Sequence, residues 1–213
     1  MGFDLPKKYL SYSAYKLWKS SKTGYRKRYY LNEQNFETPQ SMFGKHIARK
    51  IEEGWFCKGL LYKGIKEKKI EVELVEGLKI LGYMDCFDED SLSIVEYKTG
   101  HLSLKDKKPP WSDLKVYKHK QLDFYTLLTN LKYGKYNPKI HLQWLETSFE
   151  KETRMFNGKK VEQLGRGKKL KLTGNIETYE RLIEDWELEK LKEDIIKVAL
   201  EITEDYKLWK TKK

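Results

Sequence analysis

Two apolar runs separated by an acidic turn occupy residues 82–100, with the sequence GYMDCFDEDSLSIVEYKTG. Alternating apolar residues on both sides of Asp90 predict two antiparallel strands joined by a tight turn. With the turn centred between positions 90 and 91, Glu96 faces Asp85 across the strand pair. Side chains alternate along a strand, so Lys98 lies on the same face as both carboxylates. This hairpin therefore places three charged groups together inside an otherwise apolar sheet.

Two carboxylates directly opposite each other repel, and the repulsion grows with burial. The apolar neighbours Met84, Phe87, Ile94 and Val95 indicate that these strands are substantially buried. Lys98 offsets part of the repulsion, and a divalent cation would offset more of it. Carboxylate oxygens favour Mg²⁺ or Mn²⁺ over zinc. The alternative reading is an exposed sheet face on which the same charges form ordinary ion pairs.

The rest of the chain predicts an α/β (α+β) fold, with a central mixed β-sheet flanked by helices. We expect one domain over residues 1–213, with its core at about 41–146. The segments outside this core are a helical, basic and aromatic segment at 1–40, a basic loop or hairpin at 150–175 and a long C-terminal helix at 176–209. Within the core we expect a helix at 42–55, strands at 69–74, 78–87, 92–98 and 139–145, and a helix from 112 to about 131. A further strand is expected at 153–156.

The chain carries 43 Lys and Arg against 32 Asp and Glu, a formal net charge of +11. A basic protein of this size favours a polyanionic partner, usually nucleic acid. A lysine-rich codon bias would give the same composition without such a partner. No apolar run approaches the ~20 residues that span a bilayer, and the first residues lack a signal-peptide pattern. We therefore expect no membrane partner and a cytoplasmic location, in a prokaryotic or viral-host cytosol.

Four short motifs, in order, resemble those of the PD-(D/E)XK nuclease superfamily, in its RecB-like and Cas4-like branch. They are GKH at 44–46, GYMD at 82–85, EYK at 96–98 and QLDFY at 121–125. The aromatic and basic opening SYSAYKLW and the long final helix are also similar to that branch. The resemblance implies a restriction-endonuclease-like core. The chain departs from the cluster-bearing members because Cys57 and Cys86 are its only cysteines, so no iron–sulfur cluster is expected.

The resemblance also implies the parts of a metal-dependent active site. Its metal, Mg²⁺ or Mn²⁺, would be held by His46, Asp85, Glu96 and the backbone carbonyl of Tyr97. Lys98 would stabilise the attacking water and the transition state, while Gln121 and Tyr125 would help to hold the substrate strand. Glu53 would support a second metal or orient a water. His46 as a plain packing residue is the alternative interpretation.

Clustered cations extend this prediction to the DNA backbone, which proteins bind through sequence-independent contacts. The candidates are Lys105, Lys107, Lys108, Lys115, Lys118, Lys120, Arg26 and Arg28. In the N-terminal segment the interleaved tyrosines suit base stacking and core packing equally.

The function implied by the resemblance is a metal-dependent exonuclease acting on DNA ends, single- or double-stranded, in recombination, repair or phage DNA processing. Protein partners in those pathways are not specified. A structure-specific endonuclease or junction resolvase, and a catalytically inactive DNA-binding module, remain the alternatives.

Overall fold

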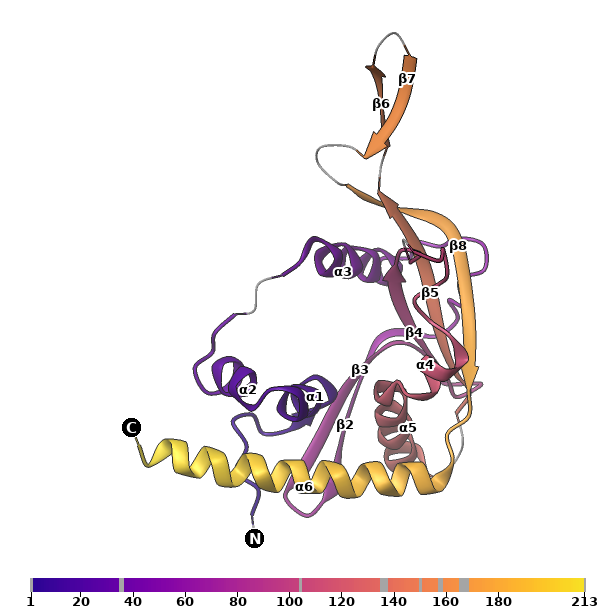
Figure 1. Ribbon diagram of the computed structural model, residues 1–213. Helices are drawn as coiled ribbons and strands as arrows, with labels where there is room; N and C mark the ends of the chain where they lie inside the picture. Colours follow the sequence, from indigo (N-terminus) through magenta and orange to yellow (C-terminus); the bar gives the residue numbers. More distant parts are fainter. Residues whose placement is uncertain are drawn as a thin grey trace.

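The computed structural model describes residues 2–34, 37–103, 105–134, 138–149, 151–156, 159–164 and 169–212. A six-stranded mixed sheet lies at its centre with helices on both faces (Figure 1). Its strands are β1 (Leu10–Ser11), β2 (Ile65–Val75), β3 (Leu78–Asp88), β4 (Ser93–Gly100), β5 (Ile140–Phe149) and β8 (Leu170–Arg181). The helices are α1 (Tyr12–Ser20), α2 (Lys22–Tyr29), α3 (Pro39–Glu52), α4 (Asp113–Tyr117), α5 (Lys120–Tyr133) and α6 (Asp185–Lys210). The predicted fold class, including the long C-terminal helix, is confirmed.

The strand β3 changes partners along one of its edges. Near the turn it pairs with β4, and the pair Cys86↔Val95 has the predicted register. The ladder ends at that pair, and β4 continues beside β5 in a parallel ladder. At Ile80 the short strand β1 pairs with β3 instead, while β2 covers the other edge along its whole length. Among the described strands, none therefore pairs with the β4-side edge of β3 from position 82 to 85, and this opening between β3 and β4 is here called the fork.

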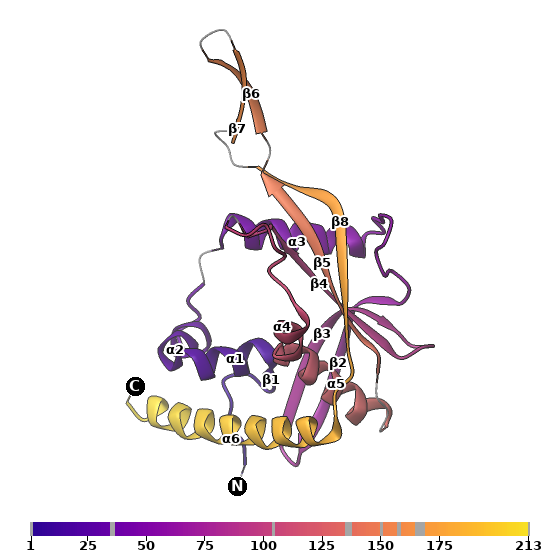
Figure 2. The same cartoon turned by 45° about the vertical axis from the view of Figure 1, so that its right-hand side comes forward.

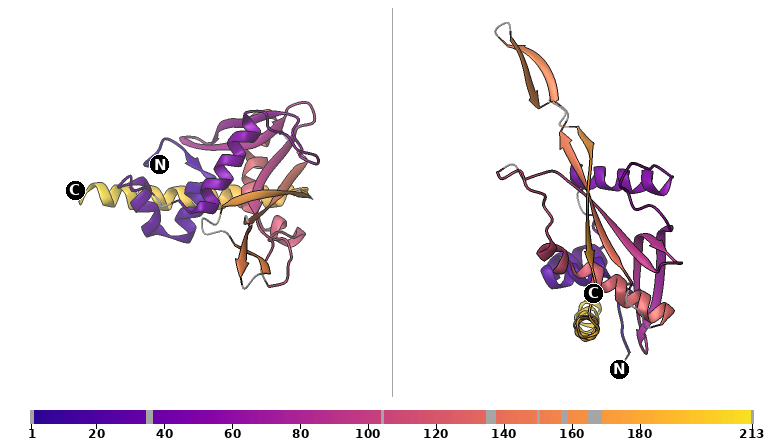
Figure 3. Two further views of the ribbon diagram at one scale, coloured as in Figure 1. Left: turned by 90° about the horizontal axis from the view of Figure 1, so that it is seen from above. Right: turned by 90° about the vertical axis from the view of Figure 1, so that its right-hand side faces the viewer.

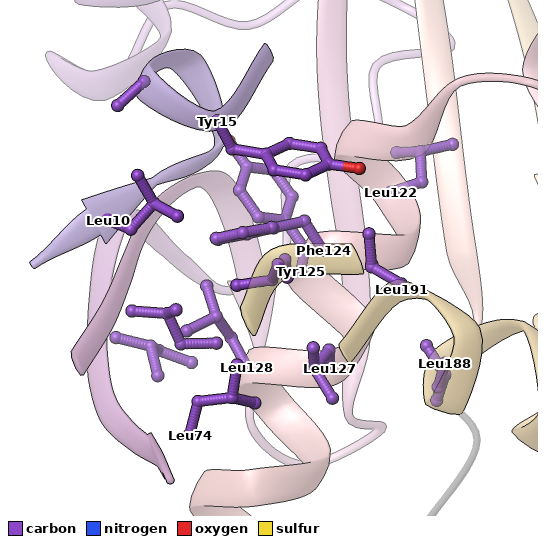
Figure 4. Packing of buried hydrophobic residues seen from close by; sticks show 14 of the residues in the cluster. Leu10, Tyr15, Leu74, Leu122, Phe124, Tyr125, Leu127, Leu128, Leu188 and Leu191 are labelled. Carbon is purple, nitrogen blue, oxygen red and sulfur yellow. The ribbon is translucent and has the colours of Figure 1, made fainter. Parts of the chain in front are cut away.

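The two faces of the sheet carry separate apolar cores. On one face α5, α6 and α1 bury a large cluster that includes Leu122, Phe124 and Leu128, drawn in Figure 4. On the other face α3 packs Ile47 and Ile51 against β4 and β5. The fork lies between these two layers, since α3 covers it from one side and α5 from the other (Figure 1).

The predicted helix over 176–209 is wrong in its first part. Residues up to Arg181 belong to β8, which pairs antiparallel with β5, and the helix begins at Asp185. The β-branched and aromatic residues of ETYER and TGNI favour a strand where a sheet edge is available. Likewise, residues 170–175 extend this strand rather than a loop. The predicted helix from 112 is interrupted after Tyr117, so that Ser112 caps α4 and a second helix, α5, starts at Lys120.

The remaining strands, β6 (Lys151–Phe156) and β7 (Lys159–Leu164), form a separate two-stranded sheet. This hairpin projects beyond the ends of β5 and β8, away from the body (Figures 2 and 3). Of the two alternatives expected for 150–175, a basic loop or a hairpin, these strands form the hairpin. Among the described helices, none is both long and apolar enough to cross a membrane.

A buried ion cluster fixes α5 against β8 and α6. Arg181, at the end of β8, lies 2.7 Å from Asp123 of α5 and 2.8 Å from Glu187 of α6. All three side chains are almost completely buried. Arg181 also donates to the carbonyl of Tyr117, so one guanidinium joins four segments of the chain.

We predict that Arg181→Met lowers the free energy of unfolding by about 3–5 kcal/mol, because the buried Glu187 loses its nearest cation and the buried Asp123 keeps only Lys120. Urea denaturation measures the change. The matched variant Arg28→Met, at an exposed arginine of α2, should change the free energy by less than about 1 kcal/mol. Equal stability of the two variants would contradict a structural role for the cluster.

Candidate active site

Asp85 lies where β3 and β4 part. Its Oδ2 accepts a 2.7 Å hydrogen bond from the backbone N–H of Tyr97. A side chain thus replaces the strand ladder at the first position beyond Cys86↔Val95. This bond holds the carboxylate in the fork, beside Glu96 of the neighbouring strand.

Gly82 allows α5 to approach the fork. A Cβ at this position would lie 2.6 Å from Leu128 Cδ1 and 3.1 Å from Tyr125 Cε1. A larger residue would force the Leu128 side chain to move and would crowd the Tyr125 ring. The glycine of the GYMD motif therefore has a steric reason, which is to bring Tyr125 against the strand that carries Asp85.

Four motif side chains form one polar chain from β4 to α5. Lys98 forms an ion pair with Glu96 and donates to Gln121 Oε1 at 3.2 Å. Gln121 in turn donates from Nε2 to Tyr125 Oη at 2.7 Å. Gln121 and Tyr125 are four residues apart and so lie on one face of α5. The structure therefore brings all of the EYK and QLDFY candidates together with Asp85.

Burial controls the charges of this site. Desolvation, followed by the nearby Glu96, raises the pKa of Asp85 well above its usual range. Burial alone would lower the pKa of Lys98, but the Glu96 carboxylate outweighs it and the pKa of Lys98 is raised. Lys98 consequently stays an ammonium ion at neutral pH, which suits a phosphate-facing cation and not a general base.

The donor set fits a divalent cation. Glu96 is only 2% exposed, and its Oε2 is buried with no hydrogen-bond partner among the residues that the structure describes. An unpaired buried carboxylate oxygen is costly, and the Asp85 carboxylate lies close enough to repel it. Two hard oxygen donors in this state are suited to Mg²⁺ or Mn²⁺.

The structure does not bring His46 or Glu53 to the carboxylates. The pocket around Asp85 and Glu96, about 420 Å³ and here called the carboxylate pocket, is lined from α3 by Gly44, Ala48 and their neighbours. His46 is two residues from both and lies on another face of the helix, exposed. Glu53 follows the last turn and pairs with Arg49 at 3.3 Å. In the described part of the chain, no three His, Cys, Asp or Glu side chains cluster as a metal site.

Glu67 is a neighbour of the site that the sequence did not single out. It lies on β2 between the pairs Lys66↔Cys86 and Lys68↔Met84, opposite Asp85. Its backbone is in the left-handed region, with φ of 49°, which is strained for a glutamate. Its carboxylate contributes to the raised pKa of Asp85. The sequence could not have predicted this position, because a glutamate in a strand of alternating charged residues is typical of any exposed strand.

A groove of about 670 Å³ leads away from Gln121 and Tyr125 and is here called the tyrosine groove. Aromatic and basic side chains line it, namely Tyr9, Tyr12, Tyr29, Tyr83, Lys7, Lys16 and Arg28. Other N-terminal aromatics, such as Trp18 and Tyr25, are buried in the core instead. Core packing is therefore the role of Trp18 and Tyr25, while the tyrosines that line the groove remain candidates for base stacking.

A third hollow, the aromatic pocket, is also lined by Lys98 and has a volume of about 450 Å³. Its walls are Phe43, His101, Pro110, Trp111 and Leu170, with Lys98, Thr99 and Lys115 beside them. Lys98 and Thr99 also line the carboxylate pocket, so the two hollows adjoin.

The predicted DNA-binding cations have different surroundings. Arg28 lines the tyrosine groove and Lys115 the aromatic pocket. Arg26 pairs with Asp205 of α6, and Lys120 pairs with the buried Asp123 at 2.5 Å. These two cations hold elements together and are less free to bind phosphate. The others are exposed, namely Lys105, Lys107, Lys108 and Lys118.

Two carboxylates and a lysine lie together at the fork of a mixed sheet. A family model described as the PD-(D/E)XK nuclease superfamily matches residues 6–213. The chain belongs to this superfamily, whose nucleases typically use divalent metal ions and act on nucleic acid.

Among solved structures, a proposed exonuclease from Eubacterium rectale has the same fold. Its TM-score is 0.57 at 13% sequence identity, and the match covers 93% of this chain and 82% of that one. The crystal structure of SSO0001 matches with a TM-score of 0.48 at 17% identity, over 90% of this chain and 77% of that one. No curated protein matches the sequence significantly.

We predict that Asp85→Asn raises the melting temperature in EDTA, because the asparagine keeps an acceptor for the Tyr97 N–H and removes the repulsion with Glu96. The same variant should lose the rise in melting temperature that Mn²⁺ gives the unaltered protein. Thermal melts with EDTA and with Mn²⁺ test both expectations. Asp90→Asn, at the exposed turn, is the control and should respond to Mn²⁺ normally. A metal response retained by Asp85→Asn would be evidence against this metal site.

His119, packed against Trp111, gives a prediction about pH. Burial, followed by the Lys98 charge, lowers the pKa of His119 to about 4. The unfolded chain binds a proton at about pH 6.5, so this histidine stabilises the fold above that pH and destabilises it as pH falls toward 4. The slope is up to about 1.4 kcal/mol per pH unit. Urea unfolding at several pH values should show a shallower loss for His119→Gln. Parallel curves for the two proteins would rule out this contribution.

Proposed function

We propose that the protein is a Mg²⁺- or Mn²⁺-dependent deoxyribonuclease of the RecB-like and Cas4-like branch, without an iron–sulfur cluster. The single observation that carries the proposal is the polar chain Glu96–Lys98–Gln121–Tyr125 beside Asp85, at a fork that opens into the tyrosine groove. A site of two buried carboxylates serves metal-dependent hydrolysis, and the basic and aromatic lining of the groove suits a nucleic-acid strand.

Each residue of the polar chain has a distinct role in this proposal. Asp85, Glu96 and the backbone carbonyl of Tyr97 would hold the metal ion, which supplies an acidified water and neutralises charge on the phosphate. Lys98 stays protonated and faces the phosphate, where its charge stabilises the transition state. Gln121 holds Lys98 in this position and is itself held by Tyr125.

The groove and its cations support sequence-independent binding. Lys7, Lys16 and Arg28 would contact phosphates, and the tyrosines would stack on bases of any identity. Lys105, Lys107, Lys108 and Lys118 add positive charge on the surface near the helix that follows the site. Little base specificity is expected from contacts of this type.

Cleavage from DNA ends is the mode that we favour, with recombination, repair or phage DNA processing as the biological context. The resemblance of the Gln121 and Tyr125 helix to end-processing enzymes supports this mode. The name of the Eubacterium rectale protein, a proposed exonuclease, points in the same direction. The intact set of Asp85, Glu96 and Lys98 argues against a DNA-binding module that has lost catalysis.

We expect Lys98→Met to reduce Mg²⁺-dependent cleavage of end-labelled DNA by about 10²- to 10³-fold, because it removes one preorganised charge from the transition state. Binding of the same DNA in EDTA should change little, since one cation among many is lost. Lys190→Met, at an exposed lysine of α6, is the matched control and should cleave normally. Cleavage by Lys98→Met at the normal rate would exclude this mechanism.

Linear and covalently closed circular DNA distinguish the modes of cleavage. An exonuclease should degrade the linear form with Mg²⁺ or Mn²⁺ and leave the circle intact, because the circle has no end to enter the groove. Gel electrophoresis of both substrates over time is the measurement. Nicking or cutting of the circle would favour the structure-specific endonuclease or junction resolvase, and no cleavage of either would favour the inactive module.

A further inference from the structure

The aromatic pocket has two kinds of lining. Phe43 from α3 and Pro110 and Trp111 from a loop make part of the lining apolar and aromatic. Lys98 and Lys115 also line the pocket and give it positive charge. A ligand that matches both kinds of lining has a flat aromatic part and a negative charge within one short unit.

The loop wall of this pocket is held from behind. Tyr179 Oη donates to the Trp111 carbonyl at 3.3 Å, and Lys115 Nζ donates to the Pro110 carbonyl at 2.6 Å. The Trp111 ring meets His119 edge-on, with ring centroids 5.1 Å apart. These contacts come from β8, α4 and the start of α5, so the Trp111 ring is preorganised, which lowers the entropic cost of binding.

An unused hydrogen-bond donor lies beneath the pocket. Trp144 is fully buried, and its Nε1 has no hydrogen-bond partner among the described residues. A Cβ at Gly100, which lines the pocket, would lie 3.0 Å from this nitrogen. A buried N–H without a partner is uncommon and calls for an explanation. Here it is separated from the pocket only by a glycine.

We propose that the aromatic pocket holds an unpaired nucleobase of the substrate strand, next to the phosphate that is cleaved. Stacking on aromatic rings accepts any base, and Lys98 lies between this pocket and the carboxylate pocket, where the phosphate of the same or the adjacent nucleotide would lie. The inference rests on the proposed function for the identity of the ligand. It adds that the nucleotide at the cleavage point must leave any duplex before it is cut.

A binding experiment that combines a protein variant with a DNA strand lacking bases tests this pocket without relying on cleavage. Binding of two equally long single strands, oligothymidine and a strand of abasic deoxyribose units, is measured in EDTA by fluorescence anisotropy. We expect Trp111→Ala to weaken binding of oligothymidine by at least about fivefold. Binding of the abasic strand should be unchanged, because it has no base to stack. Phe43→Leu, from the opposite wall, should act in the same direction, which guards against a folding defect in one variant.

The control variant is Trp186→Ala, at a tryptophan that is 61% exposed on α6, and it should bind both strands as the unaltered protein does. Equal weakening of both strands by Trp111→Ala, or no weakening, would overturn the pocket, as would failure of the unaltered protein to bind oligothymidine. The proposed function fails separately, if Mg²⁺ or Mn²⁺ supports no cleavage. If the protein does not cleave DNA but Trp111→Ala still weakens binding of oligothymidine alone, the proposed base pocket stands and the proposed nuclease activity is rejected.

Discussion

The hydrogen bond from the Tyr97 N–H to Asp85 is the interaction on which the site depends. It occupies the place where the next rung of the β3–β4 ladder would be. Because a side chain takes that donor, β4 is free to leave β3 and run beside β5, while β1 pairs with β3 lower down. The gap between these partners is the fork. A carboxylate therefore both ends the strand pair and stands in the opening that results.

The elements around the fork are held at distances that only a few residues allow. Gly82 admits α5, so that Gln121 reaches Lys98. Gly44 admits α3 from the other face, since a Cβ there would lie 3.1 Å from Thr99 Oγ1. The Arg181 cluster then fixes α5 against β8 and α6. The position of Lys98 therefore depends on contacts between elements other than its own strand. A preorganised charge requires support of this kind.

Sequence patterns predicted structure correctly where the structure depends on neighbouring residues, and wrongly where it depends on distant segments. The register of the hairpin follows from alternation and turn position, and Cys86↔Val95 confirms it. The strand nature of 176–181 depended on the free edge of β5, which is distant in sequence, so an apolar spacing read as helical was wrong. His46 was proposed because GKH resembles the glycine–histidine motif of the family, but the side chain two residues after Gly44 on a helix lies on another face and does not line the carboxylate pocket. The neighbour Glu67 was missed because its strand alternates like any exposed edge.

By itself, the sequence determined the residues that can perform the chemistry: two carboxylates, a lysine and a glutamine–tyrosine pair, with glycines at the close contacts. Their identities and local spacing are properties of the chain, as are the periods of its strands and helices. Only the tertiary structure decided which of them meet. It separated Arg26 and Lys120, held in ion pairs, from Arg28 and Lys115, which line hollows. It also placed an aromatic pocket beside Lys98, because its walls come from five segments of the chain that only the tertiary structure brings together.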